Sequence, residues 1–251
     1  MIPVAISKYT QNIMLNSLHI PIEFTVENGS YHIHIWGKGN DASLGTEDVV
    51  AAQGRHLTRY YAKNHEMNLA LLHQVHGNTV VEARFEKTSA NPDSMADADA
   101  MFAAGGNAAL AIKTADCIPI LFFHKRKLLY GAIHTGWKGL ELNIFTKTLE
   151  EIRQDPKDFV FIIGPHIFQE NYETNEDVFL RFPPEYSRPG LSAKKRYLSL
   201  TRILRNEMNT CKVDSRQIIQ IPENTFGSDR FFSHRGGNSG RNFNIIYFQP
   251  K

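Results

Sequence analysis

The chain has little cysteine: its 251 residues include only Cys117 and Cys211. Two cysteines cannot form the disulfide framework of a small secreted domain, so the composition indicates a reducing compartment. No apolar stretch is long enough to span a bilayer. The N-terminus also lacks a basic region followed by a continuous apolar core, so we expect no signal peptide. We therefore predict a cytoplasmic protein with no membrane partner.

Net charge is also scarce, since the formal value is only +2. Such a small excess does not indicate a nucleic acid or an acidic membrane surface as the partner. Apolar residues at 42% and charged residues at 22% are typical of a folded soluble protein. We find no linker, low-complexity segment or short-period repeat in the sequence. We therefore predict one domain covering residues 1–251.

Short apolar runs alternate with helical patterns along the chain. The predicted strands are Tyr31–Trp36, Asn68–His73, Thr79–Ala83, Ile118–His124, Leu128–His134, Phe159–Gly164, Gln217–Ile221 and Phe243–Phe248. Helices are predicted from about Thr46, over Gly139–Gln154 and over Tyr197–Cys211, with a long loop between Thr88 and Asp97. This alternation predicts an α/β (α+β) domain in which helices flank a mixed β-sheet.

Cys117 is the most informative residue, because a histidine can be placed beside it. The runs Ile118–His124 and Leu128–His134 flank the basic triplet 125–127, a pattern typical of a β-hairpin. A two-residue turn in this triplet would place Cys117 directly opposite His134, and opposed side chains share one face of a sheet. A three-residue turn would shift the pairing by one residue. The hairpin therefore predicts a thiol beside an imidazole.

His76 is a third candidate, because it follows a predicted strand and precedes Gly77, which lets the backbone turn close to a site. Together with Cys117 and His134 it supplies two imidazoles and one thiolate. This ligand set suits zinc and leaves the fourth tetrahedral position for water or substrate. Zinc would lower the pKa of bound water to about 7 and polarise a substrate oxygen. The alternative is that the cysteine is a buried apolar thiol and that the histidines are ordinary polar residues.

Six short motifs occur in a fixed order between roughly residues 70 and 248. They are Gln74-Val-His-Gly77, Ala96-Asp-Ala-Asp-Ala100, Thr114-Ala-Asp-Cys-Ile-Pro119, Ile133-His-Thr-Gly-Trp-Lys-Gly139, Ile163-Gly-Pro-His-Ile167 with Asn171-Tyr-Glu173, and Ser233-His-Arg235 with Ser239-Gly-Arg241. The series resembles the signatures of the YfiH-like family, also called the laccase-domain or polyphenol oxidase family. Because several motifs match in order, the resemblance is specific.

The resemblance implies that His76, Cys117 and His134 bind one zinc ion, with copper the less favoured metal. It also implies a purine nucleoside enzyme. Such an enzyme performs phosphorolysis of adenosine, inosine, guanosine and methylthioadenosine, and it deaminates adenosine. The expected partners are therefore a purine nucleoside and phosphate. The sequence leaves the preferred nucleoside and the oligomeric state open.

Asp116 completes the candidate catalytic set of His76, Cys117, His134 and Asp116. It could handle the proton when activated water attacks C6 of adenine, or it could cap a turn or orient a ligand. Trp137 could stack on a purine, as could Tyr172, or both could belong to the core or its rim.

Phosphorolysis requires donors for phosphate, and three cations near the motifs are candidates. They are Lys138, Arg235 and Arg241, close to glycines at positions 236, 237 and 240 that allow backbone N–H groups to face an anion. Each of the three could instead be a solvated surface charge.

The N-terminal third departs from the family pattern. Members usually carry Thr-Arg-x-Gly-Gly followed by Ser-Leu-Asn-Leu-Gly, and within residues 35–45 of this chain only Ser43-Leu-Gly45 resembles it. Lys38 stands in the region of the arginine and lacks its bidentate fork. The family's Cys-Cys-Tyr-Glu-Val motif is Glu170-Asn-Tyr-Glu-Thr174 here. These differences leave the three metal ligands intact and affect positions relevant to substrate choice.

Three other functions stay open. Cys117 could act as a nucleophile with His134 as its base, for example in hydrolysis or editing of peptidoglycan precursors. Copper-dependent phenol oxidation is disfavoured, because one soft ligand set cannot supply the several copper centres of a laccase. A non-catalytic binding protein is the third option, and the complete ligand set argues against it.

Overall fold

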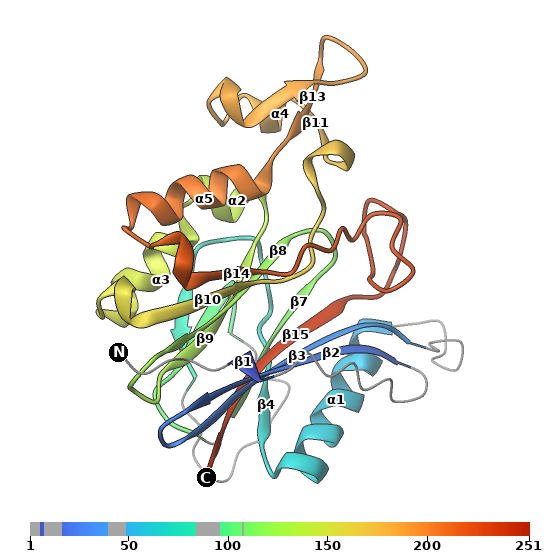
Figure 1. The fold of residues 1–251 in the computed structure, drawn as a ribbon. Helices are drawn as coiled ribbons and strands as arrows, with labels where there is room; N and C mark the ends of the chain where they lie inside the picture. The colour runs from blue at the N-terminus through green and yellow to red at the C-terminus, as the bar shows by residue number, and fades with distance from the viewer. Residues whose placement is uncertain (1–5, 8–16, 40–48, 84–95, 107) are drawn as a thin grey trace.

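The computed structural model describes residues 6–7, 17–39, 49–83, 96–106 and 108–251 (Figure 1). The strands are β1 (Ile6–Ser7), β2 (Ser17–Val26), β3 (Gly29–Gly39), β4 (Asn68–Ala70), β5 (Val80–Glu82), β6 (Ala100–Ala103), β7 (Ala108–Thr114), β8 (Ile118–His124), β9 (Tyr130–Thr135), β10 (Phe159–Ile163), β11 (Glu173–Asn175), β12 (Ser187–Pro189), β13 (Lys195–Leu198), β14 (Ile218–Gln220) and β15 (Asn242–Pro250). The α-helices are α1 (Val49–His65), α2 (Trp137–Glu141), α3 (Ile144–Ile152), α4 (Glu176–Phe179) and α5 (Leu200–Thr210).

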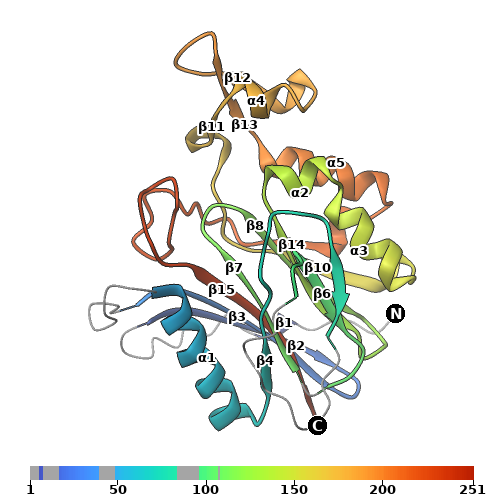
Figure 2. The same cartoon turned by 180° about the vertical axis from the view of Figure 1, so that it is seen from behind.

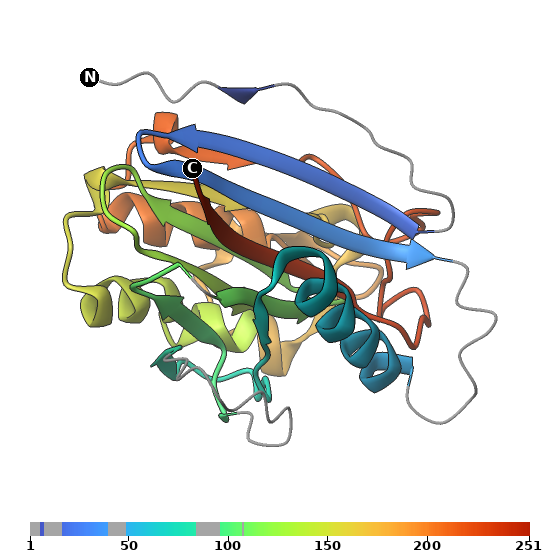
Figure 3. The same cartoon turned by 90° about the horizontal axis from the view of Figure 1, so that it is seen from below.

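Two six-stranded sheets pack face to face. The first has the order β1-β2-β3-β15-β7-β4 and the second the order β14-β10-β8-β9-β6-β5. Their facing side chains, such as Ile33 of β3 and Phe123 of β8, form one apolar core. The opposite face of the first sheet packs against α1, and that of the second against α2, α3 and α5 (Figures 1 and 2). The described residues therefore form four layers, and Figure 3 shows β2, β3 and β15 side by side in one of them.

Because helices cover the outer faces, the central strands bury both of their sides. Along β15, Ile246 and Phe248 face the second sheet, whereas Ile245 and Tyr247 face α1. Strands buried on both sides read as continuous apolar runs rather than as alternating ones. This explains why the apolar pattern located β8 at the predicted bounds Ile118–His124.

A small antiparallel sheet of order β11-β13-β12 accompanies α4 and projects from the four layers (Figures 1 and 2). Nothing in the sequence pattern predicted it, because its strands are only three or four residues long. The predicted α/β class with mixed strand pairing is confirmed, with three sheets in place of the single one expected.

Two predicted helices have different limits in the structure. The segment Gly139–Gln154 forms α2 and α3 instead of one helix, because Asn143 adopts a left-handed conformation with φ of 55°. The first two residues of the predicted helix Tyr197–Cys211 belong to β13, and α5 begins only at Leu200. The Ser199 side chain accepts a hydrogen bond from the N–H of Arg202 at the start of that helix. The predicted helix start at Thr46 and most of the predicted loop lie outside the described residues. None of the described helices is both long and apolar enough to cross a bilayer.

Histidines and aromatic side chains fill the layer between α1 and the first sheet. Ile33 and Ile35 of β3 are buried in the core between the sheets, and His34 on the other face of β3 is also buried because α1 covers it. His34 Nδ1 lies 2.6 Å from the hydroxyl of Tyr61 on α1, and the ring of His19 stacks on Trp36 with centroids 4.1 Å apart. Burial, assisted by nearby His65, lowers the pKa of His19 to about 4. Burial likewise holds the pKa of His34 well below its usual value.

Acidification should therefore destabilise this layer. A histidine whose folded-state pKa lies below its usual 6.5 contributes fully above pH 6.5, and its contribution is lost as pH falls toward about 4. We expect a lower thermal midpoint at pH 5 than at pH 7.5. His19→Phe keeps the stacked ring and should flatten this dependence, whereas His56→Phe on the exposed face of α1 should not. Scanning calorimetry measures the thermal midpoint at each pH. An equal change of the midpoint with pH in the unsubstituted protein and in both variants would contradict the assignment of this dependence to His19.

Candidate metal centre

The hairpin of β8 and β9 brings Cys117 and His134 together in a register that differs from the prediction. Pro119, and not Cys117, lies opposite His134. The turn is longer because His124 Nδ1 accepts hydrogen bonds from the N–H groups of Arg126 and Lys127, both at 3.0 Å. The strand pairing is therefore shifted by two residues from the predicted one. Because side chains alternate between the two faces of a sheet, a shift of two keeps Cys117 on the same face as His134, as its diagonal neighbour. The predicted direct pairing of Cys117 with His134 was wrong, but the predicted proximity of the thiol and the imidazole is confirmed.

Three side chains converge beside this hairpin: His76, Cys117 and His134. Their ligand atoms all lie within 4.8 Å of one another, and this is the one such group in the described part of the chain. In a tetrahedral zinc site, bonds of about 2.0–2.3 Å place ligand atoms roughly 3.5 Å apart, so small side-chain rotations suffice. His134 is buried, Cys117 is half-buried and His76 is exposed. The group is therefore open to solvent on the side of His76.

The backbone at His76 wraps around a buried carboxylate. The N–H groups of Val75, His76 and Gly77 donate to Asp99 at 3.2, 3.0 and 2.6 Å. Three successive donors on one carboxylate form an anion-binding nest. His76 itself takes the left-handed conformation, with φ of 59°. The carboxylate of Asp99 is therefore the partner that holds this loop in place.

Asp99 also orients His134. Its Oδ1 lies 2.8 Å from His134 Nδ1, and its side chain is fully buried. A histidine that donates from Nδ1 to a carboxylate keeps Nε2 available for a metal. Burial opposes ionisation of Asp99, but hydrogen bonds from His134 and from the loop hold its pKa below its usual value. Asp99 lies within a motif noted in the sequence, yet no spacing argument singled it out.

The thiol and the imidazole stabilise each other's charged forms. Burial disfavours the thiolate of Cys117, but the charge of His134 and hydrogen bonds from His134 and His76 lower its pKa to about 6. Burial also disfavours a charged His134, yet Cys117 and Asp99 raise its pKa to about 9. Thiolate is the form that ligates metals and attacks electrophiles. The donor set therefore fits a soft or borderline divalent cation such as zinc.

Gly136, rather than Gly77, is the glycine that the centre requires. A Cβ atom on Gly136 would lie 2.8 Å from Cys117 Sγ and 3.5 Å from His76 Cδ2. A Cβ on Gly77 would meet its nearest neighbours, Asp99 and Val75, at an ordinary 3.6 Å. The expected role of Gly77 in turning the chain is therefore wrong, because His76 makes that turn. The missing side chain at Gly136 provides the space in which the ligands meet.

Three hydrogen bonds fix the position of Asp116. Its Oδ1 accepts from the hydroxyl of Thr225 at 2.7 Å, and its Oδ2 accepts from the main-chain N–H of Arg235 at 2.6 Å. Its carbonyl oxygen accepts from the N–H of Ile167 at 3.0 Å, and its φ is 88°. Of the roles considered for Asp116, this geometry favours positioning of the turn before Cys117.

Arg235 and Tyr172 lie next to this turn. The Arg235 guanidinium lies 5.2 Å from the Tyr172 ring centre and donates to the carbonyl of Glu173 at 2.8 Å. Burial, together with the charge of Cys117, raises the pKa of Tyr172.

The other substrate candidates have different surroundings. Trp137 packs against the core behind the second sheet, with Lys138 Nζ 5.6 Å from its ring centre. The Arg241 guanidinium donates to the carbonyl oxygens of Ser239 and Gly240. Lys38 donates to the carbonyl of Ser228 at 2.6 Å. Each of these four residues therefore has contacts within the protein.

Comparison with known proteins identifies the family and agrees with the fold. The profile of the family described as multi-copper polyphenol oxidoreductase laccase matches residues 25–249. The chain belongs to this family.

Solved structures of similar fold include a Neisseria meningitidis protein of family DUF152, with a TM-score of 0.76, 22% identity and coverage of 92% of this chain and 99% of that one. Another is the Bacillus licheniformis protein YfiH, with a TM-score of 0.75, 18% identity and coverage of 97% and 100%. These likenesses establish the fold.

Two curated relatives carry the name purine nucleoside phosphorylase. The protein of Rickettsia conorii is 32% identical over 156 residues, which are 62% of this chain and 60% of the relative. The protein of Clostridium acetobutylicum is 26% identical over 187 residues, which are 71% of this chain and 76% of the relative. The match thus spans about 60% of the length of the Rickettsia protein.

Gly136→Ala should reduce metal binding without unfolding the protein. The backbone of Gly136 has a φ of −93°, which residues with side chains adopt without strain. The added Cβ therefore affects mainly Cys117 Sγ, 2.8 Å away. We expect lower zinc content by elemental analysis and a nearly unchanged thermal midpoint. Gly77→Ala, in the same centre but with an open Cβ position, is the matched control and should retain its metal. Full occupancy in Gly136→Ala would refute the steric argument.

Asp99→Asn should weaken metal binding through His134 and the loop at His76. An amide offers hydrogens where the loop N–H groups require an acceptor, and loss of a ligand's carboxylate partner typically costs about 10–100-fold in affinity. Competition with a chromophoric chelator measures this change. Asp97→Asn is the control in the same motif, because Asp97 is exposed and pairs with His73 at 2.6 Å. Equal affinities of the two variants would exclude the orienting role of Asp99.

Proposed function

We propose that this protein is a metal-dependent purine nucleoside enzyme whose reaction takes place at His76, Cys117 and His134. The observation that carries the proposal is the convergence of these three ligand atoms within 4.8 Å, with one side open to solvent. The printed name of the relatives, purine nucleoside phosphorylase, supplies the substrate class. The proposed reactions are phosphorolysis of purine nucleosides and deamination of adenosine.

Zinc is the proposed resident metal. Two imidazoles and one thiolate are zinc ligands, and three protein ligands with an open fourth position are typical of catalytic sites. When bound, zinc supplies a Lewis acid and an activated water. Copper is the alternative suggested by the family's description. The described residues offer only one such ligand group, whereas a laccase needs several copper centres.

The chain's own residues have the following tasks in this proposal. Asp99 fixes the Nδ1 proton of His134 and the loop that carries His76. Asp116 fixes the turn before Cys117 and, through its bond to the main-chain N–H, the position of Arg235. Arg235 then presents its guanidinium at the rim as a donor for phosphate oxygens. The phenol of Tyr172 lies beneath this guanidinium and can donate a hydrogen bond to a nucleoside.

Lys138, Arg241 and Trp137 are the further proposed substrate contacts. Lys138 is exposed on α2, and its positive charge suits attraction of phosphate. Arg241 lies in the glycine-containing segment, where its carbonyl contacts leave other guanidinium N–H groups free to bind an anion. Trp137 is partly exposed and offers a ring edge for a purine.

A second candidate function rests on the electrostatics of Cys117. A thiol with a pKa of about 6 beside an imidazole with a pKa of about 9 is the pair used by cysteine nucleophiles. Hydrolysis of a cell-wall precursor by this pair would use the same residues without a metal. Metal dependence therefore separates the two candidates.

The experiment that tests the first candidate is a product assay with defined nucleosides. Zinc-loaded protein is incubated with adenosine, inosine, guanosine or methylthioadenosine, with and without phosphate, and products are separated by chromatography. Phosphorolysis predicts free base only when phosphate is present, whereas deamination predicts inosine from adenosine without phosphate. We expect Cys117→Ala to lower both rates by at least about 100-fold, because a metal ligand is lost.

Cys211→Ala is the control for the thiol, since Cys211 lies at the C-terminal end of α5, with its sulfur 3.3 Å from the hydroxyl of Thr146. It should keep full activity. Chelation should abolish turnover, and added zinc should restore it. Activity that survives chelation but not alkylation of Cys117 would favour the thiol nucleophile. No product from any nucleoside with zinc bound would defeat the proposal.

A further inference from the structure

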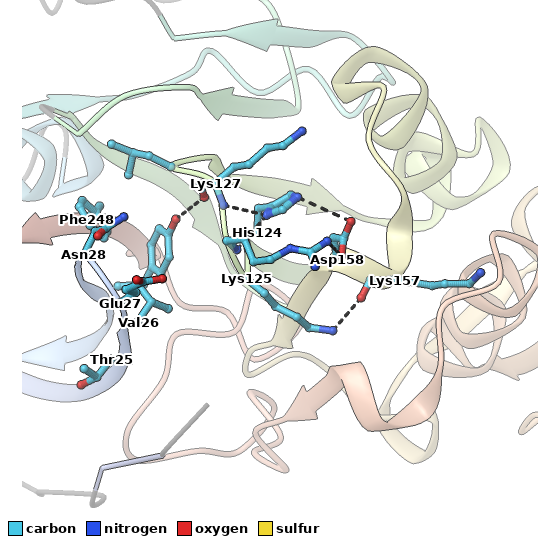
Figure 4. A pocket seen from close by; sticks show the side chains of 13 residues that line it. Thr25, Val26, Glu27, Asn28, His124, Lys125, Lys127, Lys157, Asp158 and Phe248 are labelled. Carbon is cyan, nitrogen blue, oxygen red and sulfur yellow. Dashed lines mark hydrogen bonds and ion pairs between the residues drawn. The ribbon is translucent and has the colours of Figure 1, made fainter. Parts of the chain in front are cut away.

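A pocket of about 480 Å³ lies at the opposite end of the β8–β9 hairpin from the candidate metal centre (Figure 4). Because β8 has seven residues, the two sites are roughly 20 Å apart. The pocket lies between the β2–β3 turn, the β8–β9 turn and the short helical turn Pro156–Asp158. Tyr31 and Phe248 complete the lining.

Positive charge dominates the lining. Four cationic side chains face two carboxylates, and Arg126 already pairs with Asp158 at 2.7 Å. Lys125 donates to the carbonyl oxygen of Lys157 at 2.7 Å, and Lys127 donates to the amide oxygen of Gln154. These acceptors are neutral, so neither hydrogen bond neutralises a lysine charge, and the charge of Lys125 acts in addition on the carboxylate of Asp214. The pocket therefore favours an anion.

The donor nitrogen of His124 lacks an acceptor and faces the carboxylate of Asp158 (Figure 4). It is 1% exposed, and its Nδ1 accepts from two N–H groups of the turn. An imidazole nitrogen that accepts carries no hydrogen, so the neutral ring carries its proton on Nε2. Among the described residues this buried Nε2 has no hydrogen-bond partner. The nearest carboxylate oxygen, of Asp158, is 3.9 Å away, and Arg126 offsets its charge.

The remaining lining is apolar. Val26, Leu128 and Phe248 contribute side chains, and the ring of Tyr31 is fixed by a hydrogen bond of 2.9 Å from its hydroxyl to the carbonyl of Lys127. The volume lies in the range of small-molecule pockets, about 300–1,000 Å³. A phosphate ion alone would leave most of this space unfilled. The lining therefore suits a molecule with both an anionic and an apolar part.

We propose that this pocket binds an organic phosphate monoester, with the phosphoryl group at Lys125 and Lys127 and the organic group against Val26 and Phe248. The phosphoryl oxygens accept hydrogen bonds from the two ammonium groups. This site is independent of the proposed reaction, because it shares no residue with the metal centre. Its occupant acts as a bound ligand and undergoes no chemistry.

Calorimetric titration of the zinc-loaded protein with adenosine 5′-monophosphate tests the proposal, with adenosine and inorganic phosphate as matched probes. We expect the monophosphate to bind more tightly than either, with an affinity that falls as salt is added. Lys125→Ala combined with Lys127→Ala should weaken binding by at least about tenfold. Lys147→Ala, on the exposed face of α3, is the control and should leave it unchanged.

Binding that persists in the double lysine variant but disappears in Cys117→Ala would overturn the proposal, because the ligand would then occupy the metal centre. No binding at about 1 mM would also overturn it.

Discussion

The buried carboxylate of Asp99 is the interaction on which the candidate centre depends. It accepts hydrogen bonds from three successive main-chain N–H groups at residues 75–77 and from Nδ1 of His134. Its own carbonyl oxygen also accepts from the N–H of His134 at 2.7 Å. One residue thereby joins the loop of the first ligand to the strand of the third. The hairpin supplies Cys117 as the second, and Gly136 leaves the space where they meet.

Much of the fold follows from apolar patterning, because both faces of the central strands are covered. β8 agrees with its predicted bounds for this reason. Irregular backbone was not predictable from periodicity. Asn143 divides one expected helix in a left-handed conformation, and the His124 side chain lengthens the hairpin turn by bonding two of its N–H groups. The helix break and the longer turn each depend on one residue, whereas the periodicity of apolar residues is a property of a whole segment.

For the site, the three ligands could be named from the sequence and the structure brings them together. The predicted proximity of Cys117 and His134 was correct although the predicted register was wrong. The register error was two residues rather than one, so both side chains remain on the same face of the sheet. Asp99 was missed, since its role depends on contacts with residues more than 20 positions away. Gly136 was missed as well, because a required absence of side-chain volume leaves no pattern in a single sequence.

The hydrogen bonds that hold the loop at residues 75–77 come from its main chain. Substitution of Val75 leaves its N–H in place, so mutations there can accumulate while the geometry persists. Asp99 has no such freedom, because its side chain makes the contact. The two halves of this interaction therefore differ in how many side chains they tolerate. The arrangement around Cys117 can persist while the loop that supports it changes in sequence.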